Sequence, residues 1–247
     1  MAGRIRVGIG GWTFEPWRGT FYPQGLRQKD ELAYVGAHLT ATEINATYYS
    51  TQKPATFANW AKAVPDGFQF AVKASRFCTN RRVLAEAGES IAKFVNQGLS
   101  ELGDRLGPIL WQFMPTKKFD ADDFGAFLQL LPASVGGVAL RHALEARHES
   151  FDDPAFLDLA RDSGAAVVFA DHDAYPAIRG HDVGFSYARL MRTRAEEPTG
   201  YPPQDIERWA AMAREQAEHG DMFAFFIAGG KIRNPAAAMA LIDGVNQ

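Results

Sequence analysis

Short apolar runs alternate along the chain with longer stretches in which apolar residues recur at helical spacing. Several of the short runs are apolar almost throughout, which is typical of strands buried on both faces of a parallel sheet. We predict strands at 4–10, 42–47, 68–74, 107–113, within 138–147, and at 165–171, 185–191 and 222–228. Between them we predict helices at 29–39, 54–64, 83–102, 122–131, 154–162, 202–219 and 235–245.

Two of the predicted helices begin with a residue that can cap a helix followed by a proline. These starts are Asp153-Pro154 and Asn234-Pro235. A short polar side chain accepts a hydrogen bond from the first turn, and proline fits the first helical position. We therefore expect the side chains of Asp153 and Asn234 to cap their helices.

Eight strands, each except the sixth followed by a helix, predict a TIM-type (β/α)8 barrel. Residues 172–184 carry no helical pattern, so one connection lacks a clear helix. The 247 residues match the length of about 250 that is usual for this barrel, and we expect a single barrel domain over 1–247. The alternative, an open doubly wound sheet, needs a phosphate-binding glycine turn after the first strand. Here the glycines before Trp12 lead to Pro16 rather than into a helix, so that motif fails in its context.

Composition and charge narrow the function classes. The formal net charge is −3, from 26 Lys and Arg against 29 Asp and Glu, which argues against a protein that coats nucleic acid. The single cysteine, Cys78, cannot form an internal disulfide and indicates a reducing, cytoplasmic location. The start of the chain lacks the apolar core of a secretory signal, and prolines and glycines break the longest uncharged run. We expect a small-molecule partner, neither nucleic acid nor membrane, and no cofactor; the oligomeric state stays open.

Polar side chains end six of the eight predicted strands. In barrels of this type, the chemistry lies at the carboxyl ends of the strands. Alternation along the second strand places Glu43, Asn45 and Thr47 on one face. The remaining candidates are Lys73, Gln112, Glu145, Arg147, Asp171 and Arg189. Since burying unpaired charge costs several kcal/mol per ion, six such ends together favour a polar pocket over the packed barrel. The alternative is that single residues, such as Glu145 and Arg147, form ion pairs between neighbouring strands.

The predicted pocket is enriched in positive charge. Glu43, Glu145 and Asp171 face a larger set of cations at or just after the strand ends. These cations are Lys73, Arg76, Arg81, Arg82, Arg147, Arg189, Arg192 and Arg194. Guanidinium groups suit bidentate binding of phosphate or carboxylate, so we expect a small anionic ligand.

The loop after the first strand, 12–26, is long and rich in aromatic residues, among them Trp12, Trp17 and Phe21. Long loops in compact domains are often functional. An aromatic lid would stack on a sugar or a base, with Trp12 as a substrate-binding candidate. The same residues would otherwise form a hydrophobic cluster that seals the barrel.

Several short motifs occur in a specific order and spacing. They are Gly10-Gly11-Trp12, Trp17-Arg18-Gly19, Phe21-Tyr22-Pro23, Glu43-Ile44-Asn45, Phe70-Ala71-Val72-Lys73, 106–112 and 145–151. On these motifs the chain resembles the domain of unknown function 72 family, also called YecE-like, from about residue 5 to residue 243. The resemblance implies a TIM-type barrel and no particular reaction. The chain departs from the usual family pattern at Asn80 and Met191, where members carry histidine, and at Ile227-Ala228, where members carry an asparagine pair.

Three chemistries fit the candidate residues. The leading hypothesis is acid/base chemistry on a small anionic or sugar-like substrate. In it, Glu43 or Glu145 transfers a proton, Lys73 acts as electrophile or second base, Arg147 and Arg189 clamp the anion, and Asn45 and Gln112 orient it. Glu43 and Glu145 would also suit a glycosidase pair at the right separation.

The second hypothesis is a metal-dependent lyase, isomerase or hydrolase in which Glu43, Glu145, Asp171 and His172 gather around a divalent ion. The neighbouring cations would repel such an ion. The third hypothesis is a binding module without catalysis, which the replacement of the family's histidines favours.

Overall fold

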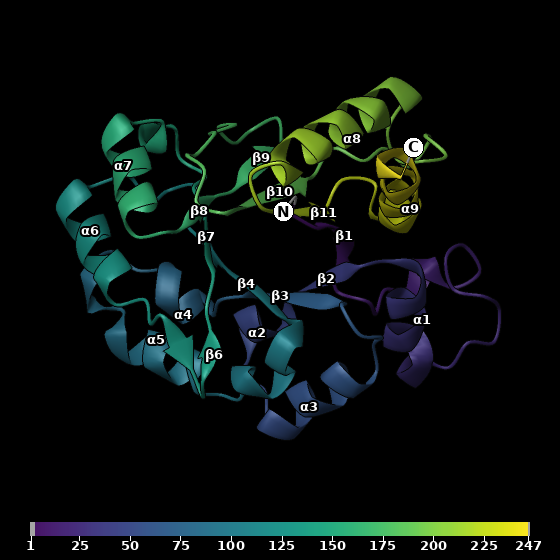
Figure 1. Ribbon diagram of the computed structural model, residues 1–247, viewed down its shortest axis with the longest axis horizontal. Coiled ribbons are helices and arrows are strands. Elements are labelled where there is room, and N and C mark those ends of the chain that lie inside the picture. The colour runs from purple at the N-terminus through teal and green to yellow at the C-terminus, as the bar shows by residue number, and fades with distance from the viewer. Residues whose placement is uncertain (1–2, 247) are drawn as a thin grey trace.

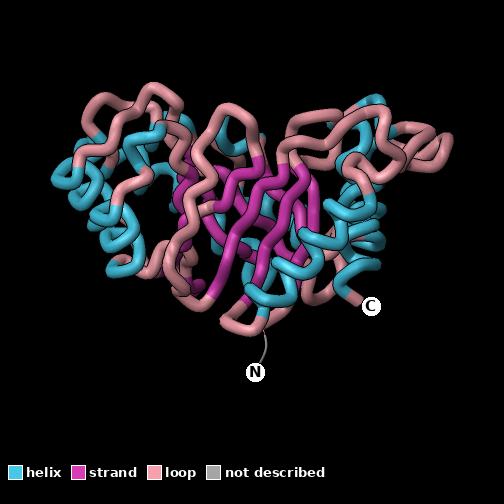
Figure 2. The backbone as a smooth tube through the Cα atoms, turned by 90° about the horizontal axis from the view of Figure 1, so that it is seen from above, coloured by secondary structure: helices cyan, strands magenta, loops and turns pink. Residues whose placement is uncertain are grey.

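Nine parallel strands form one curved sheet in the computed structural model, which describes residues 3–246. Their order is β8 (Ala166–Val167), β7 (His142–Glu145), β4 (Leu106–Gln112), β3 (Gln69–Lys73), β2 (Ala41–Ile44), β1 (Ile5–Gly10), β11 (Asp221–Phe226), β10 (Phe185–Leu190) and β9 (Phe169–Asp171). Helices surround this sheet (Figure 1), and the strands run side by side through the middle of the molecule (Figure 2).

The first and last strands of this order belong to one stretch of chain. β8 pairs with β7, whereas β9 pairs with β10. Between them, the backbone N–H of Val168 donates to the carbonyl of Leu144 at 2.9 Å. The sheet therefore curves into a nearly closed barrel whose two edges meet in this stretch, and the eight predicted strands and the TIM-type fold are confirmed.

Nine helices cover the barrel within residues 3–246. They are α1 (Glu31–His38), α2 (Ala46–Tyr49), α3 (Pro54–Lys62), α4 (Arg76–Thr79), α5 (Gly88–Val95), α6 (Ala121–Gln129), α7 (Pro154–Asp162), α8 (Pro203–Ala217) and α9 (Asn234–Val245). A short hairpin, β5 (Ser134–Val135) and β6 (Val138–Ala139), lies outside the barrel. The connection 172–184 contains no helix, as predicted.

Three local predictions need correction. The strand predicted to reach Thr47 ends at Ile44, since the chain turns there into α2, and Thr47 therefore does not share a strand face with Glu43. The helix predicted at 83–102 is broken, because Gly98 adopts a φ of 122° and ends the helical path. Asn234 does not cap α9: its buried side chain accepts a hydrogen bond from the Thr193 hydroxyl at 2.7 Å. Asp153 does cap α7, by accepting from the N–H of Ala155.

Side chains from alternate strand positions fill the barrel in layers, as is usual for this fold. At the amino end, the Arg141 guanidinium lies 4.9 Å above the ring of Phe223 and donates to Asp221 at 3.0 Å. Above this layer pack the buried side chains of Leu110 and Phe225 together with small alanines. The lower barrel is thus filled, and a second charged layer lies at the carboxyl ends of the strands.

The aromatic loop after β1 seals the barrel from outside rather than covering its mouth. Trp17 and Tyr22 are fully buried, and the Trp17 indole donates to the carbonyl of Lys231 at 2.9 Å. Trp12 packs edge-to-face on Trp60 of α3, with ring centroids 5.2 Å apart. These contacts support the sealing interpretation of this loop, whereas a role of Trp12 in substrate binding stays a prediction.

No helix within residues 3–246 combines the length and the apolar character needed to cross a membrane.

One residue near the end of β11 carries backbone strain. Ala228 adopts a φ of 61°, in the left-handed region, and its side chain is exposed. This conformation costs an L-residue about 1–2 kcal/mol, and glycine avoids that cost at some expense in unfolded-state entropy. We expect Ala228→Gly to raise the free energy of unfolding by about 0.5–1 kcal/mol.

Urea unfolding of the Ala228→Gly variant tests this expectation. The matched control is Ala211→Gly, at an exposed position inside α8, where glycine should lower stability by about 1 kcal/mol. Equal losses of stability in both variants would contradict the account of Ala228.

Candidate functional site

Five predicted residues meet at the carboxyl end of the barrel, and we call this group the mouth cluster. It consists of Glu43, Lys73, Gln112, Glu145 and Arg189. Each lies at or next to the end of a different strand: β2, β3, β4, β7 and β10 respectively. Because parallel strands end at one rim of the barrel, residues separated by more than a hundred positions in the sequence come together.

Arg189 forms the centre of the mouth cluster. Its Nη1 donates to Oε2 of Glu145 at 2.6 Å, and its Nη2 and Nε donate to the two carboxylate oxygens of Glu43 at 3.1 and 3.2 Å. Arg189 is only 2% exposed, and both carboxylates are fully buried. The guanidinium is therefore bound by the protein's own carboxylates rather than open to a ligand.

Glu145 accepts three side-chain hydrogen bonds. Besides Arg189, the Nε of Arg147 donates to it at 2.8 Å and the amide of Gln112 at 2.7 Å. Burial raises the pKa of Glu145, but the guanidinium groups of Arg189 and Arg147 outweigh this effect and hold the pKa at about 2. The side chain is therefore ionised at neutral pH and does not serve there as a proton donor.

Lys73 differs from the two arginines of this region. Its Nζ lies 4.2 Å from the ring centroid of Tyr48, and within residues 3–246 no carboxylate oxygen lies within 4.0 Å of it. Burial lowers the pKa of Lys73, the nearby Arg189 lowers it further, and the carboxylates only partly offset this, so the pKa is about 8. Lys73 is the cation whose charge the mouth cluster does not neutralise directly.

Arg147 connects the mouth cluster to the helix-less connection. Its guanidinium lies 4.4 Å above the ring of Tyr175, and its Nη1 donates to the Tyr175 hydroxyl at 3.3 Å. The ring of His172 stacks on the same Tyr175 ring, and the two ring centroids lie 4.0 Å apart. The Nη2 of Arg147 has no hydrogen-bond partner in the described part of the chain, so this group is available to a ligand.

The remaining predicted site residues lie outside the mouth cluster. Asp171 accepts a hydrogen bond from the Tyr201 hydroxyl at 2.8 Å and pairs with Arg192 at 3.1 Å. Asn45 donates to the backbone carbonyl of Glu43 at 3.3 Å, next to the cluster. Trp12 packs on Trp60, as described above.

Most of the predicted cations also have other partners. Arg192 and Arg194 form exposed ion pairs with Asp173 and Glu197. Arg81 donates to the carbonyls of Phe77 and Glu86 and to the hydroxyl of Ser90. Among the predicted cations, Lys73, Arg147 and Arg189 are the ones whose interactions involve the glutamates of the mouth cluster. They face two carboxylates, which leaves the mouth positively charged when Lys73 is protonated.

The four ligands of the metal hypothesis do not converge. Asp171 is directed to Tyr201, and His172 stacks on Tyr175. Glu43 and Glu145 are both engaged by Arg189. Across residues 3–246, no three His, Cys, Asp or Glu side chains are grouped so that they can hold a metal ion.

Sequence reasoning missed two tyrosines of the site. The hydroxyl of buried Tyr187 donates to Glu43 at 2.7 Å, one layer below Arg189 on β10. Tyr48, in α2, lies below the Lys73 ammonium and accepts a hydrogen bond from the side-chain amide of Asn80 at 3.1 Å. Alternation along 185–191 identifies Tyr187 as inward-facing together with Arg189, whereas nothing in the local pattern marks Tyr48.

The comparisons with known proteins agree with this architecture. A crystal structure of a DUF72 family protein from Thermotoga maritima MSB8 is similar with a TM-score of 0.78 and 21% identity, over 99% of this chain and 100% of that one. A xylose isomerase-like TIM barrel/4-hydroxyphenylpyruvate dioxygenase fusion protein matches with a TM-score of 0.57 and 14% identity, over 96% of this chain and 42% of that one. Both similarities concern the fold.

At the level of sequence, UPF0759 protein YunF of Bacillus subtilis (strain 168) is 24% identical over 159 residues, which are 62% of this chain and 54% of the relative. The chain thus aligns with about half the length of that protein. The family model described as protein of unknown function DUF72 matches residues 6–247. The chain therefore belongs to the DUF72 family.

Proposed function

We propose that this protein binds a small anionic ligand at the carboxyl end of its barrel, with Lys73 as the principal anchor. The observation that carries the proposal is the position of Lys73: its half-buried side chain lies at the mouth over the Tyr48 ring, and within residues 3–246 no carboxylate oxygen lies within 4.0 Å of its ammonium. Burying a charge without a partner is costly. A phosphate or carboxylate group placed beside Lys73 removes that cost, and the free Nη2 of Arg147 supplies a second donor.

The same geometry supports acid/base chemistry on the bound ligand. A lysine with a pKa of about 8 exchanges its proton close to neutral pH, as a general acid or base requires. Glu43 and Glu145 then act as fixed negative charges that hold Arg189 in place. This assignment moves the proton-transfer role from the two glutamates to Lys73.

A glycosidase mechanism fits the cluster less well. Such a mechanism needs one carboxyl group that stays protonated because its pKa is raised. The two guanidinium groups instead hold the pKa of Glu145 at about 2. Glu43 and Glu145 are bridged by one guanidinium, which occupies the oxygens that a sugar would need.

Calorimetric titration with inorganic phosphate, sulfate and glucose tests the proposed binding. We expect phosphate and sulfate to bind the parent protein and glucose to bind more weakly. Lys73→Met should weaken phosphate binding on the order of 10- to 100-fold, the value of one hydrogen bond to a charged group. Lys62→Met, at an exposed position of α3, is the matched control and should bind as the parent does. Equal phosphate affinity of the two variants would refute the proposal that Lys73 anchors the anion.

The pH dependence of phosphate binding follows from the same residue. The protonated ammonium attracts the anion, and Lys73 loses its proton as the pH rises through about 8. We expect the affinity to fall tenfold or more between pH 7 and pH 9.5, and Lys73→Met to lack this dependence. An affinity that stays constant over this range in the parent protein would contradict the assignment.

A further inference from the structure

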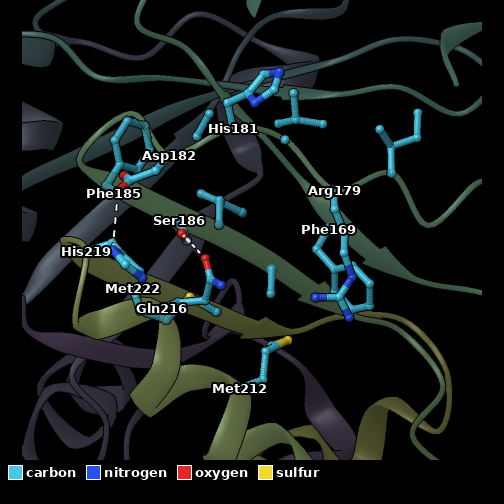
Figure 3. A pocket seen from close by; sticks show the side chains of 16 residues that line it. Phe169, Arg179, His181, Asp182, Phe185, Ser186, Met212, Gln216, His219 and Met222 are labelled. Carbon is cyan, nitrogen blue, oxygen red and sulfur yellow. Dashed lines mark hydrogen bonds and ion pairs between the residues drawn. The ribbon is translucent and has the colours of Figure 1, made fainter. Parts of the chain in front are cut away.

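A cavity lies against the outside of the barrel, where the sixth strand has no helix to cover it (Figure 3). It holds about 220 Å³ and is bounded by β8, β9, β10, α8 and residues 178–182. None of the residues of the mouth cluster lines it. Tyr187, which lines the cavity and donates its hydroxyl hydrogen bond to Glu43, lies between this cavity and the mouth cluster.

The topology of the sheet explains the cavity. β9 pairs with β10 only from Phe169 and Ala188 upward, whereas β8 pairs with β7 on its other side. The sheet therefore parts between β8 and the lower half of β10. The connection crosses this gap as an extended segment, and Gly180 lies so close to Val167 that a Cβ on it would come within 2.7 Å of the Val167 Cβ.

The walls of the cavity are mainly apolar. Val167 and Phe169 line it from the strands, Ile178 from the connection, and Met212 from α8. Met222, at the start of β11, closes the floor. A dry cavity of about 150 Å³ is enough to hold benzene. A ring or a short acyl chain therefore fits in this one, and the methionine side chains adapt readily to either.

Polar groups with unused donors lie beside the apolar walls. The Ser186 hydroxyl donates to Oε1 of Gln216 at 2.7 Å, which leaves the Gln216 amide N–H groups without an acceptor in the described structure. Arg179 lies 5.2 Å above the ring of Phe169, and within 3–246 no acidic oxygen lies within 4.0 Å of its guanidinium. Figure 3 shows Arg179 and Gln216 on opposite sides of the cavity.

The rim carries further titratable groups. Nδ1 of His219 lies 3.6 Å from Asp182, and Nε2 of His181 lies 3.9 Å from Asp158. Asp182 is the single carboxylate among the lining residues of the described chain, and it lies beside His219. Arg179 is the single guanidinium among them, and it lies over the Phe169 ring rather than beside that carboxylate.

We propose that this cavity binds a small amphipathic carboxylate, an acid with a short acyl chain or a single aromatic ring. The apolar body of the ligand packs against Met212 and Met222, and its carboxylate accepts hydrogen bonds from Arg179 or Gln216. This ligand uses both properties of the cavity: apolar walls, and donors without acceptors. A neutral apolar molecule would leave the donors unused, and a highly polar one would leave the walls unmatched.

Calorimetry with octanoate below its micelle concentration tests this proposal, and octanol is the uncharged comparison. We expect octanoate to bind at least tenfold more tightly than octanol, and Arg179→Gln to remove most of this difference. The matched control is Arg208→Gln, because Arg208 is also an exposed arginine above an aromatic ring, that of Trp209. It should bind octanoate as the parent does.

Two further variants locate the binding. Met212→Trp fills the cavity from a half-buried position and should abolish octanoate binding. Lys73→Met should leave it unchanged, which separates this site from the proposed function. Octanoate that fails to bind the parent, that binds Met212→Trp as tightly, or that is matched by octanol would overturn the proposal. If Met212→Trp does not fold, the comparison of Arg179→Gln with Arg208→Gln still shows whether octanoate binds through Arg179.

Discussion

We expect the free energy of unfolding of Lys73→Met at pH 7 to be about 3 kcal/mol higher than that of the parent protein, although the variant binds the anion less tightly. The pKa of Lys73 falls from 10.5 to about 8 on folding, mainly because of burial and then because of Arg189. Each unit of pKa corresponds to about 1.4 kcal/mol, so the ammonium is costly in the folded protein. Methionine keeps the aliphatic body of the side chain and removes the charge.

The stability of the parent protein should also depend on pH through Lys73. Between about pH 8 and pH 10.5, the unfolded chain keeps a proton on Lys73 that the folded protein has lost. The stability of the parent therefore rises with pH in this window. Lys73→Met should lack the rise. Urea unfolding of the parent, Lys73→Met and Lys62→Met at pH 7 and pH 10 measures it, and a loss of stability in Lys73→Met at pH 7 would contradict the account.

Replacement of Arg189 has the opposite consequence. Arg189→Met leaves the buried carboxylates of Glu43 and Glu145 close together without their shared cation. Removal of one partner from a buried ion pair typically costs about 3–5 kcal/mol, because the remaining charge has no compensation. We expect a loss of this size in urea unfolding at pH 7. Arg161→Met, which removes an exposed arginine paired with Asp158, should leave the free energy of unfolding nearly unchanged.

A combined variant separates lost charge compensation from lost packing. Glu43→Gln and Glu145→Gln, added to Arg189→Met, remove the uncompensated charges and should recover most of the stability. The triple variant would stay as unstable as Arg189→Met if packing alone were responsible. In the parent, the ionised form of Glu145 stabilises the fold above pH 4.5. That contribution should disappear as the pH falls toward 2, since the pKa of Glu145 is depressed in the folded state.

The two predictions together describe a site in which the protein's own carboxylates neutralise only part of the positive charge. Arg189 stabilises the fold by neutralising two glutamates, whereas Lys73 destabilises it. Functional groups often reduce stability in this way, because their charge serves a ligand rather than the protein.

The barrel was predictable because its strands are short apolar runs and because the segments between them carry apolar residues at helical spacing. Closure through Val168 was not, since it depends on which neighbour each half of one strand pairs with. The break after α5 follows from the left-handed conformation of Gly98. A glycine in an otherwise helical sequence pattern does not by itself predict such a conformation.

The sequence predicts which residues meet at the site better than it predicts which of them pair with one another. Glu43, Lys73, Glu145 and Arg189 follow from the rule that parallel strands end at one rim. Asp171 ends its strand as well, but it faces away from the cluster toward Tyr201. A strand that is apolar on both faces carries no alternation from which its orientation could be inferred. Whether a cation pairs with carboxylates, as Arg189 does, or lies over an aromatic ring, as Lys73 does, depends on contacts between residues far apart in the sequence.

Titration of the Lys73 side-chain amine by nuclear magnetic resonance measures the property on which anion binding at the mouth depends. We expect a pKa near 8 in the free protein and a higher pKa when inorganic phosphate is present, because the bound anion stabilises the ammonium. A pKa near 10.5 that phosphate does not change would contradict this expectation.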